Sequence, residues 1–243
     1  MIQVRNIKKS FDGQPVLKGI NLDIPDNTTM VILGPSGQGK TVFIKTLVRL
    51  IDPDAGSIHY DGEDILRMPT KEWLHFQNNI AFVFQNSALF DFLDVQDNLS
   101  LFLQMHKSLT LRQCEQEVSR AINFVGLDED VLEKFPEELS GGMRKRVAIA
   151  RAMIKRPKYI FYDEPTTGLD QNNAEKISEL IDMLKKEISA TSIIVTHDIK
   201  LMRDVSDRVA LLREGTISFV GGRDEISAEK LDFLYETRGA YDI

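Results

Sequence analysis

The sequence predicts an α/β fold, and three features of the chain support this prediction. A β-prone run over 28–33 leads into a glycine-rich stretch and then into a helix-like segment. Nearly continuous apolar runs follow at 80–84, 159–162 and 192–196, as in strands that are covered on both faces. Helical periodicity prevails between about 95 and 154. Buried strands that alternate with helices favour a parallel sheet flanked by helices.

Length and composition are compatible with one such domain. The 243 residues suffice for one large α/β domain, or for a domain with an inserted subdomain, and can bury a sizeable core. Hydrophobic residues make up 42% and charged residues 28%, as in ordinary globular proteins. A net charge of −7 argues against a broad nucleic-acid-binding face. The single cysteine, Cys114, has no neighbouring metal ligands and is interpreted as structural.

The sequence lacks the usual signals for export or membrane insertion. Residues 1–8 contain no apolar stretch of signal-peptide length, and no segment has the roughly 20 apolar residues that span a bilayer. We therefore expect the chain to stay in the cytoplasm and to reach a membrane only through partners.

The first part of the chain predicts two strands joined by a turn. Residues 2–7 and 20–24 alternate apolar and polar side chains, and Asp12-Gly13 is a turn signal. Phe11 stands just before this turn. Its ring either stacks on a purine or packs within the small sheet.

The glycine-rich stretch then supplies a phosphate-binding motif of the form G-x-x-x-x-G-K-[ST]. In such a loop, backbone N–H groups surround phosphates, the lysine reaches the outer phosphates and the hydroxyl holds Mg²⁺. The following helix directs its N-terminus at the same anions. The residues are Gly34, Pro35, Ser36, Gly37, Gln38, Gly39, Lys40 and Thr41.

The middle of the chain joins a short strand, a buried strand and an apolar loop. Turn formers at 52–56 precede a strand over 57–60 and a turn at Asp61-Gly62. The run 80–84 ends at Gln85, which either terminates the strand or faces a ligand crevice. Four large apolar residues follow within 88–93, in a segment that shows neither helical nor strand periodicity and is predicted to be a loop. They form a docking surface or pack into the core of a helical subdomain.

A second anion-binding helix end is predicted near Ser140. The serine is a suitable N-cap, and Gly141 and Gly142 leave the first N–H groups uncovered. Apolar residues then recur at helical spacing to residue 154. The basic run 144–146 is interpreted as a solvated face of this helix.

Carboxylates follow the next buried strand. The run 159–162 ends in Asp163-Glu164, where Mg²⁺ is a suitable partner for Asp163 and Glu164 could activate water. The alternative is a surface acidic pair that caps the strand. The strand over 192–196 delivers His197 to the same edge, where a histidine is more plausible as a functional group than as a structural one.

The remaining elements complete the α/β pattern. A turn at 167–170 leads into an amphipathic helix over 175–186. Strands are predicted at 209–212 and 216–220. The polar C-terminal part includes a short helix over 228–237.

Taken in order, these motifs resemble those of the nucleotide-binding subunit of an ABC transporter, over residues 1 to about 222. The resemblance rests on the phosphate loop, Gln85, Leu139-Ser140-Gly141-Gly142, Asp163-Glu164, Thr167-Gly168-Leu169-Asp170 and His197. It implies a P-loop NTPase (RecA-like) core with a small antiparallel β subdomain and an inserted α-helical subdomain. The core would comprise 1–85 and 158–222, the helical subdomain 86–157 and a C-terminal tail 223–243.

The resemblance also implies the chemistry. Two subunits would face each other head to tail as a homodimer, each closing its Ser140, Gly141 and Gly142 over the ATP of the other, with Asp170 at the seam. Because phosphoryl transfer depends on positioning and charge stabilisation, closure would complete the site. Within one subunit, the roles fall to Phe11 (adenine), the loop amides and Lys40 (phosphates), Thr41, Gln85 and Asp163 (Mg²⁺), Glu164 (catalytic base) and His197 (γ-phosphate).

Two residues depart from the general sequence pattern of ABC ATPases and point to a particular group within the family. Met143 stands where most signatures have glutamine, and Val42 stands where a second hydroxyl residue is usual. Together with 84–91 and 143–147, they look like the ATPases of Mla/Mce-type lipid transport systems. Such a subunit works with a membrane permease and an MCE-domain substrate-binding protein, at the cytoplasmic face of the inner membrane.

Other functions remain as alternatives. The chain could serve a different importer, or be a non-transport ABC protein that acts in cell division or on nucleic acid or ribosomes. The paired cassettes, long coiled coils and zinc insertions of the last group are not visible in the sequence. A cassette that only binds nucleotide is disfavoured, because Lys40, Asp163, Glu164 and His197 are all present.

Overall fold

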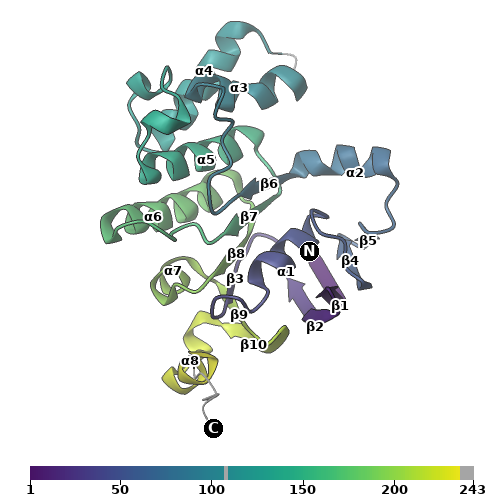
Figure 1. The fold of residues 1–243 in the computed structure, drawn as a ribbon. Coiled ribbons are helices and arrows are strands. Elements are labelled where there is room, and N and C mark those ends of the chain that lie inside the picture. Colours follow the sequence, from purple (N-terminus) through teal and green to yellow (C-terminus); the bar gives the residue numbers. More distant parts are fainter. Residues whose placement is uncertain (107–108, 236–243) are drawn as a thin grey trace. The chain divides into compact units, whose positions relative to one another are not determined.

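The computed structural model describes residues 1–106 and 109–235 and divides the chain into two compact units (Figure 1). The first unit comprises residues 1–73 together with those from 193 onward, and the second comprises 74–192. The chain passes from one unit to the other within α2 (Thr70–Phe76) and again within β8 (Thr191–Thr196).

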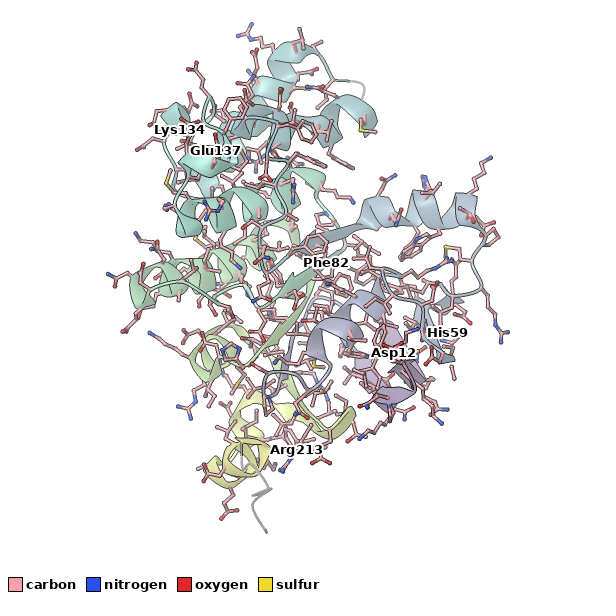
Figure 2. All side chains as sticks on the ribbon, viewed as in Figure 1. Asp12, His59, Phe82, Lys134, Glu137 and Arg213 are labelled. Atoms are coloured by element: carbon pink, nitrogen blue, oxygen red, sulfur yellow. The ribbon has the colours of Figure 1, made fainter. Side chains whose placement is uncertain are left out.

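The first unit contains an antiparallel sheet with the strand order β2-β1-β4-β5. Asp12, which Figure 2 labels, and Gly13 both have positive φ, the conformation that suits a two-residue hairpin turn. The strands beside this turn therefore pair up to its edge and are longer than predicted. These two strands are β1 (Ile2–Phe11) and β2 (Gln14–Ile24), and the other two strands of the sheet are β4 (Ala55–Tyr60) and β5 (Glu63–Asp64).

The same unit holds one part of a second, mostly parallel sheet. Every residue of β3 (Thr29–Leu33) is buried, as its continuous apolar run predicts, and β3 pairs in parallel with β9 (Arg208–Arg213). β10 (Thr216–Gly222) is antiparallel to β9, and the end of β8 lies on the other side of β3.

Three helices belong to the first unit. They are α1 (Lys40–Leu47), α7 (Ile199–Val205) and α8 (Ala228–Tyr235). The α1 helix ends at Leu47, and Arg49 two residues later takes a left-handed conformation. The last predicted residues of the C-terminal helix, 236 and 237, lie outside the described residues.

The second unit contains two parallel strands and the start of β8. β6 (Ile80–Val83) pairs with β7 (Tyr159–Asp163) from Ile80 opposite Tyr159 to Val83 opposite Tyr162. Because the strands are parallel and in this register, the residues that follow them leave the sheet at one edge. Residues 85 and 163–164 therefore belong to the same edge.

Helices surround these strands, and among the described residues no strand lies between β6 and β7. Figure 1 shows α3 and α4 beside α5, and α5 also packs against α6. Thr110 and Gln113 form a capping box at α4, and Asp170 caps α6, which therefore begins four residues before the predicted helix. The helices are α3 (Val95–His106), α4 (Leu111–Phe124), α5 (Gly141–Lys155) and α6 (Gln171–Ile188).

The predicted α/β class with a small antiparallel sheet is confirmed, whereas α2 and α7 were not predicted. Each has only seven residues, about two turns, which is too short to show a helical period clearly. Within the described parts of the chain, no helix has the length and apolarity needed to cross a bilayer.

Candidate functional site

The phosphate loop joins β3 to α1 in the first unit, as predicted. A Cβ atom on Gly34 would lie 2.3 Å from the carbonyl oxygen of Leu212, so only glycine fits there. Gly37 and Gly39 have φ values of 77° and 94°, which other residues rarely adopt. Lys40 is only 5% exposed, and its ammonium group donates to the carbonyls of Gly34 (2.8 Å) and Pro35 (2.9 Å). A cation is therefore held inside a loop of main-chain atoms.

Neighbouring strands brace this loop. The amide of Glu214, in the turn between β9 and β10, donates to Oε1 of Gln38 at 2.6 Å. The backbone of Gly39 lies so close to β2 that an added Cβ would be 3.1 Å from side-chain atoms of Val16 and Leu17. Contacts on both sides fix the shape of the loop, which is the preorganisation that anion binding requires.

The structure brings His197 next to the start of the loop. The amide of Gly34 donates to the carbonyl of Thr196 at 3.2 Å, and His197 follows Thr196 directly at the end of β8. Asp198 then caps α7 by accepting from the amides of Lys200 and Leu201. The exposed imidazole is thus fixed at its base by β8 on one side and by a capped helix on the other.

Phe11 lies at the end of β1 in the same unit, opposite Gln14. Its side chain is 43% exposed, and the ammonium group of Lys9 lies 5.3 Å from the ring centroid. The ring is therefore not enclosed by the small sheet, in contrast to one of the two predicted alternatives. Stacking on a base stays a prediction.

Asp163 is the last residue of β7 and Glu164 follows it, and both are buried in the second unit at 3% and 7% exposure, so the alternative of a surface acidic pair is wrong. Glu164 has a φ of 49°, a left-handed conformation that is uncommon outside glycine and often marks functional sites. The Thr167 amide donates to the Glu164 carbonyl at 3.3 Å, and the Thr167 hydroxyl donates to Glu164 Oε2 at 3.2 Å. The turn at 167–170 thus orients this carboxylate.

The signature stretch starts α5 as predicted. Ser140 is the N-cap, and its hydroxyl oxygen accepts from the amide of Met143 at 3.3 Å. A Cβ on Gly142 would lie 2.8 Å from Asn173 Oδ1 of α6. Asn173 in turn donates to both carboxylate oxygens of Asp170. The signature and Asp170 therefore form one continuous packed surface.

The interpretation of 144–146 as a solvated helix face is wrong. The guanidinium of Arg144 donates to the carbonyls of Pro136 and Leu139, and that of Arg146 donates to those of Val125 and Gly126. Lys145 is buried and contacts main-chain oxygens of Gln85 and Glu164. These cations satisfy carbonyl groups that end turns and strands, because such groups must be paired when they are buried.

Burial also changes the acid–base properties of Lys145. It lowers the pKa of this ammonium group to about 8, although the carboxylates of Asp163 and Glu164 act in the opposite direction. Three consecutive basic residues do not by themselves indicate that the middle one is buried. The sequence signal that could have indicated it is helical spacing, because residue 145 lies on the same face of the helix as the apolar residues Ala148, Ile149 and Ala152.

The apolar loop at 88–93 combines exposed rings with a fixed backbone. Phe90 and Phe92 are 42% and 76% exposed, and their ring centroids lie 5.7 Å apart. Buried Asn98 holds the loop: its Oδ1 accepts from the Phe90 amide, and its Nδ2 donates to the carbonyls of Phe90, Leu93 and Asp94. The loop is thus ordered although its rings face solvent.

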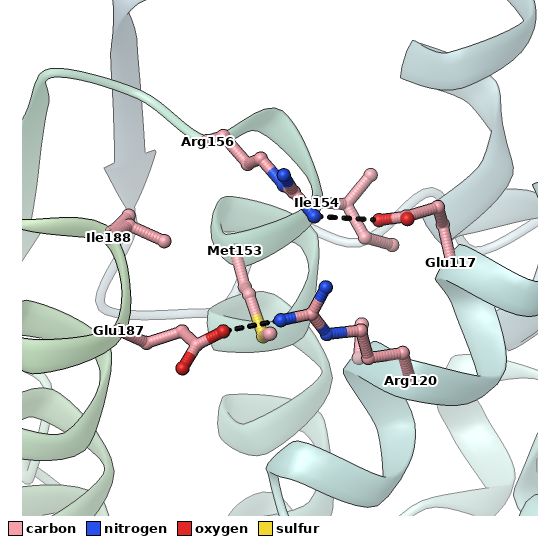
Figure 3. A pocket seen from close by; sticks show the side chains of 8 residues that line it. Glu117, Arg120, Met153, Ile154, Arg156, Glu187 and Ile188 are labelled. Atoms are coloured by element: carbon pink, nitrogen blue, oxygen red, sulfur yellow. Dashed lines mark hydrogen bonds and ion pairs between the residues drawn. The ribbon is translucent and has the colours of Figure 1, made fainter.

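A cavity of about 240 Å³ lies elsewhere in the second unit, lined by residues of α4, α5 and α6 (Figure 3). Its charged groups pair with one another, Arg120 with Glu187 and Arg156 with Glu117. None of the predicted site residues lines it. We interpret it as a packing gap between helices that ion pairs bridge.

The predicted residues are thus distributed over both units. Phe11, the phosphate loop and His197 lie in the first, and Gln85, the signature, Asp163, Glu164 and Asp170 lie in the second. Within the described residues, no group of three or more His, Cys, Asp or Glu side chains could hold a metal ion. The predicted Mg²⁺ ligands include only one carboxylate and do not require such a group.

Comparisons with curated proteins identify relatives over most of the chain. The "Probable ribonucleotide transport ATP-binding protein mkl" of Mycobacterium leprae is 38% identical over 223 residues, covering 92% of this chain and 64% of its own length. The sulfate/thiosulfate import ATP-binding protein CysA of Pseudomonas aeruginosa is 36% identical over 243 residues, covering 98% of this chain and 72% of its own. The chain therefore spans slightly less than two thirds of the mkl protein.

Solved structures agree with these relatives. The dimeric MJ0796 cassette in a post-hydrolysis state with ADP and phosphate has a TM-score of 0.84 at 29% identity, covering 92% of this chain and 99% of that one. CbiO1 of Clostridium perfringens, part of the ABC transporter complex cbiONQ, has a TM-score of 0.83 at 32% identity, with 95% and 91% covered. A family model described as "ABC transporter" matches residues 17–167. The chain therefore belongs to the ABC transporter family, as an ATP-binding domain.

Proposed function

We propose that this chain binds and hydrolyses ATP to drive a transporter. The phosphate loop carries this proposal, because Lys40 is already held inside a braced ring of main-chain groups that suits the phosphates of a nucleotide. Glu164 adds the means of hydrolysis: a buried carboxylate, oriented by Thr167, at the end of a strand. The related cassette solved with ADP and phosphate supports the same assignment.

Each residue has one task in the proposed reaction. Phe11 stacks on the adenine, and its exposed ring is accessible for this. The amides of residues 34–41 and the Lys40 ammonium group neutralise phosphate charge, and His197 contacts the γ-phosphate from the end of β8. Glu164 orients the attacking water and accepts its proton.

The residues also fit Mg²⁺ as the accompanying ion. The hydroxyl of Thr41, the amide oxygen of Gln85 and the carboxylate of Asp163 are the hard oxygen ligands that Mg²⁺ prefers, directly or through water. When bound, Mg²⁺ lowers the charge repulsion that opposes attack on the phosphate. Asp163 ends β7 at the sheet edge to which Gln85 also belongs, so two of these three oxygen ligands belong to one edge.

We propose that the active form is a head-to-tail homodimer. Ser140, Gly141 and Gly142 of one copy then contact the ATP held by the other copy. The close approach of Gly142 to Asn173, where an added Cβ would lie 2.8 Å from Oδ1, joins the signature to the start of α6 by packing. Asp170, joined to Asn173 by two hydrogen bonds, lies at the seam of the dimer.

The test of catalysis is Glu164→Gln. This variant should bind ATP as tightly as the wild type, lose at least about 100-fold in kcat and accumulate as a dimer with ATP, because only proton transfer and water orientation are removed. Nucleotide titration, phosphate release and size-exclusion chromatography measure these three effects. Hydrolysis at the wild-type rate would show that Glu164 is not the base.

For the transported substrate we propose a phospholipid or another hydrophobic molecule, moved with a membrane permease and an MCE-domain substrate-binding protein. Met143 and Val42, together with the stretches 84–91 and 143–147, support this substrate class because they look like the ATPases of Mla/Mce-type lipid transport systems. The cassette would then act at the cytoplasmic face of the inner membrane. The relatives are named for ribonucleotide transport, sulfate/thiosulfate import and spermidine/putrescine import, so a polar substrate is the competing proposal.

Purification of the native membrane complex would separate these proposals. We expect an MCE-domain protein and extractable phospholipid to copurify, whereas a bound polar solute and a different binding protein would refute the lipid proposal. The permease would dock on the loop at 88–93, where Phe92 is exposed and Leu89 is half-buried. Charged replacements at both positions should abolish membrane recruitment and leave ATP binding intact, and unchanged recruitment would contradict this docking site.

A further inference from the structure

Two cations of α5 hold the segment that follows β6. Lys145 donates to the carbonyl of Gln85, and the guanidinium of Arg151 donates to those of Ser87 (3.0 Å) and Ala88 (2.9 Å). The same Lys145 ammonium group donates to the carbonyl of Glu164 at 3.3 Å. One side chain thus links the segment after β6 with the residue after β7.

The burial of Lys145 requires an explanation. Lysine is rarely buried without partners, yet this side chain is only 5% exposed. Removing its charge from water costs free energy, and an apolar side chain of the same size would pack without that cost. What Lys145 supplies instead is a set of N–H donors in one place. Both carbonyls that receive them belong to residues with proposed roles at the ATP site.

The backbone of these residues also needs support. Glu164 has a left-handed φ of 49°, and Ser87 and Ala88 have φ values of 63° and 47°. Such conformations cost about 1–3 kcal/mol each in residues other than glycine and persist only when surrounding contacts enforce them. Lys145 donates to the backbone carbonyl of Glu164, and Arg151 donates to those of Ser87 and Ala88. The direction of the Glu164 carboxylate depends on this backbone conformation.

We propose that Lys145 is a positioning residue of ATP hydrolysis. Its ammonium group sets the distance between the backbone of Gln85 and that of Glu164, and it joins both to the helix that begins at the signature. The inference rests on the proposed function, since it assumes that these two residues act on ATP. Movement of the 85–88 segment by a docked partner would then be transmitted to Glu164 through one side chain.

Three replacements of Lys145 separate hydrogen bonding from charge and from packing. Lys145→Met keeps the length of the side chain but donates nothing, Lys145→Gln keeps two N–H donors without a charge, and Lys145→Arg keeps donors and charge. Arg146→Met is the matched control, because Arg146 is the next residue on α5 and donates to Val125 and Gly126 instead. Each full-length variant is compared with the wild type in kcat, in KM for Mg-ATP and in thermal unfolding.

Lys145→Met should lower kcat about 10- to 100-fold, as expected for the loss of a charge-assisted hydrogen bond, and should leave the KM for Mg-ATP within about twofold of the wild-type value. Lys145→Gln and Lys145→Arg should restore kcat to within about fivefold of the wild type. Arg146→Met should keep the wild-type kcat. A wild-type kcat in Lys145→Met would overturn the inference, and so would an equal loss in all three Lys145 variants that follows their loss of thermal stability.

Hydrogen exchange gives a second readout that does not depend on activity. Lys145→Met should speed amide exchange at least fivefold in peptides covering 85–90 and 163–168, and Arg146→Met should not. Unchanged exchange there would overturn the inference even if the chain hydrolysed no ATP. Failure of the proposed function would instead appear as absent turnover in the wild type, whatever the exchange pattern of the variants.

Discussion

Lys155 near the end of α5 should make the stability of the protein rise with pH. Its ammonium group donates to the carbonyl of Gln77 at 2.8 Å and lies 5.3 Å from the centroid of the Phe102 ring. Burial lowers the pKa of Lys155 from 10.5 to about 8. Between these two values the unfolded chain holds a proton that the folded chain has released. The free energy of unfolding therefore increases with pH across this window, and the gain is lost again as the pH falls from about 10.5 to about 8.

The size of the effect follows from the pKa shift. One pKa unit corresponds to about 1.4 kcal/mol, so the shift corresponds to about 3 kcal/mol. Because the side chain is partly exposed, solvent screening reduces the expected gain to about 2 kcal/mol between pH 7.5 and 10. Lys155→Met removes the titrating group and keeps an unbranched side chain of similar length.

Urea denaturation of the wild type and of Lys155→Met at several pH values measures this gain. The difference between their free energies of unfolding cancels the contribution of every other titrating group, including Lys145. We expect the wild type to gain about 2 kcal/mol relative to the variant from pH 7.5 to 10. Parallel curves, or a relative loss of wild-type stability, would refute the reasoning.

Three further predictions concern the ATP site and its surroundings. Gly142→Ala should lower the free energy of unfolding by roughly 1–3 kcal/mol in urea denaturation, because the new Cβ would lie 2.8 Å from Asn173. Gly141→Ala is the control, since its new Cβ would have its nearest contact at 3.9 Å, and its stability should stay near that of the wild type. Phe11→Ala should weaken ATP binding about tenfold in a titration with nucleotide, since stacking on one base contributes about 1–3 kcal/mol. Phe11→Trp keeps an aromatic ring and should bind ATP like the wild type. Equal ATP affinities of Phe11→Ala and the wild type would exclude stacking. Gly34→Ala should abolish ATP binding because its Cβ would lie 2.3 Å from a β9 carbonyl, and a variant that binds normally would show that the loop tolerates that shift.

The elements with a strong local pattern could be predicted from the sequence. β3, β6, β7 and β8 are short apolar runs, and burial on both faces allows hardly any other sequence. The start of α5 was predicted from Ser140 because N-capping is a local interaction. The phosphate loop was recognised for a similar reason, since its glycines and Lys40 act within eight residues of one another.

The features that depend on distant residues could not be predicted. Whether Lys145 faces solvent is decided by the carbonyls of Gln85 and Glu164, which are 60 and 19 residues away in the sequence. The left-handed backbone of Glu164 has no sequence signal, because glutamate has no preference for it. The short helix α7 begins at the N-cap Asp198. The position of this cap depends on β8, which precedes it, and therefore on the pairing of β8 within the sheet.

Asn98 has a consequence for how a partner would recognise the loop at 88–93. A loop with exposed aromatic rings usually loses conformational entropy when it binds, and that loss weakens the complex. Here four hydrogen bonds from one buried amide have already fixed the backbone around Phe90 and Leu93 during folding. A docking partner would meet a rigid surface, so affinity would depend on residue 98, which itself remains out of the partner's reach.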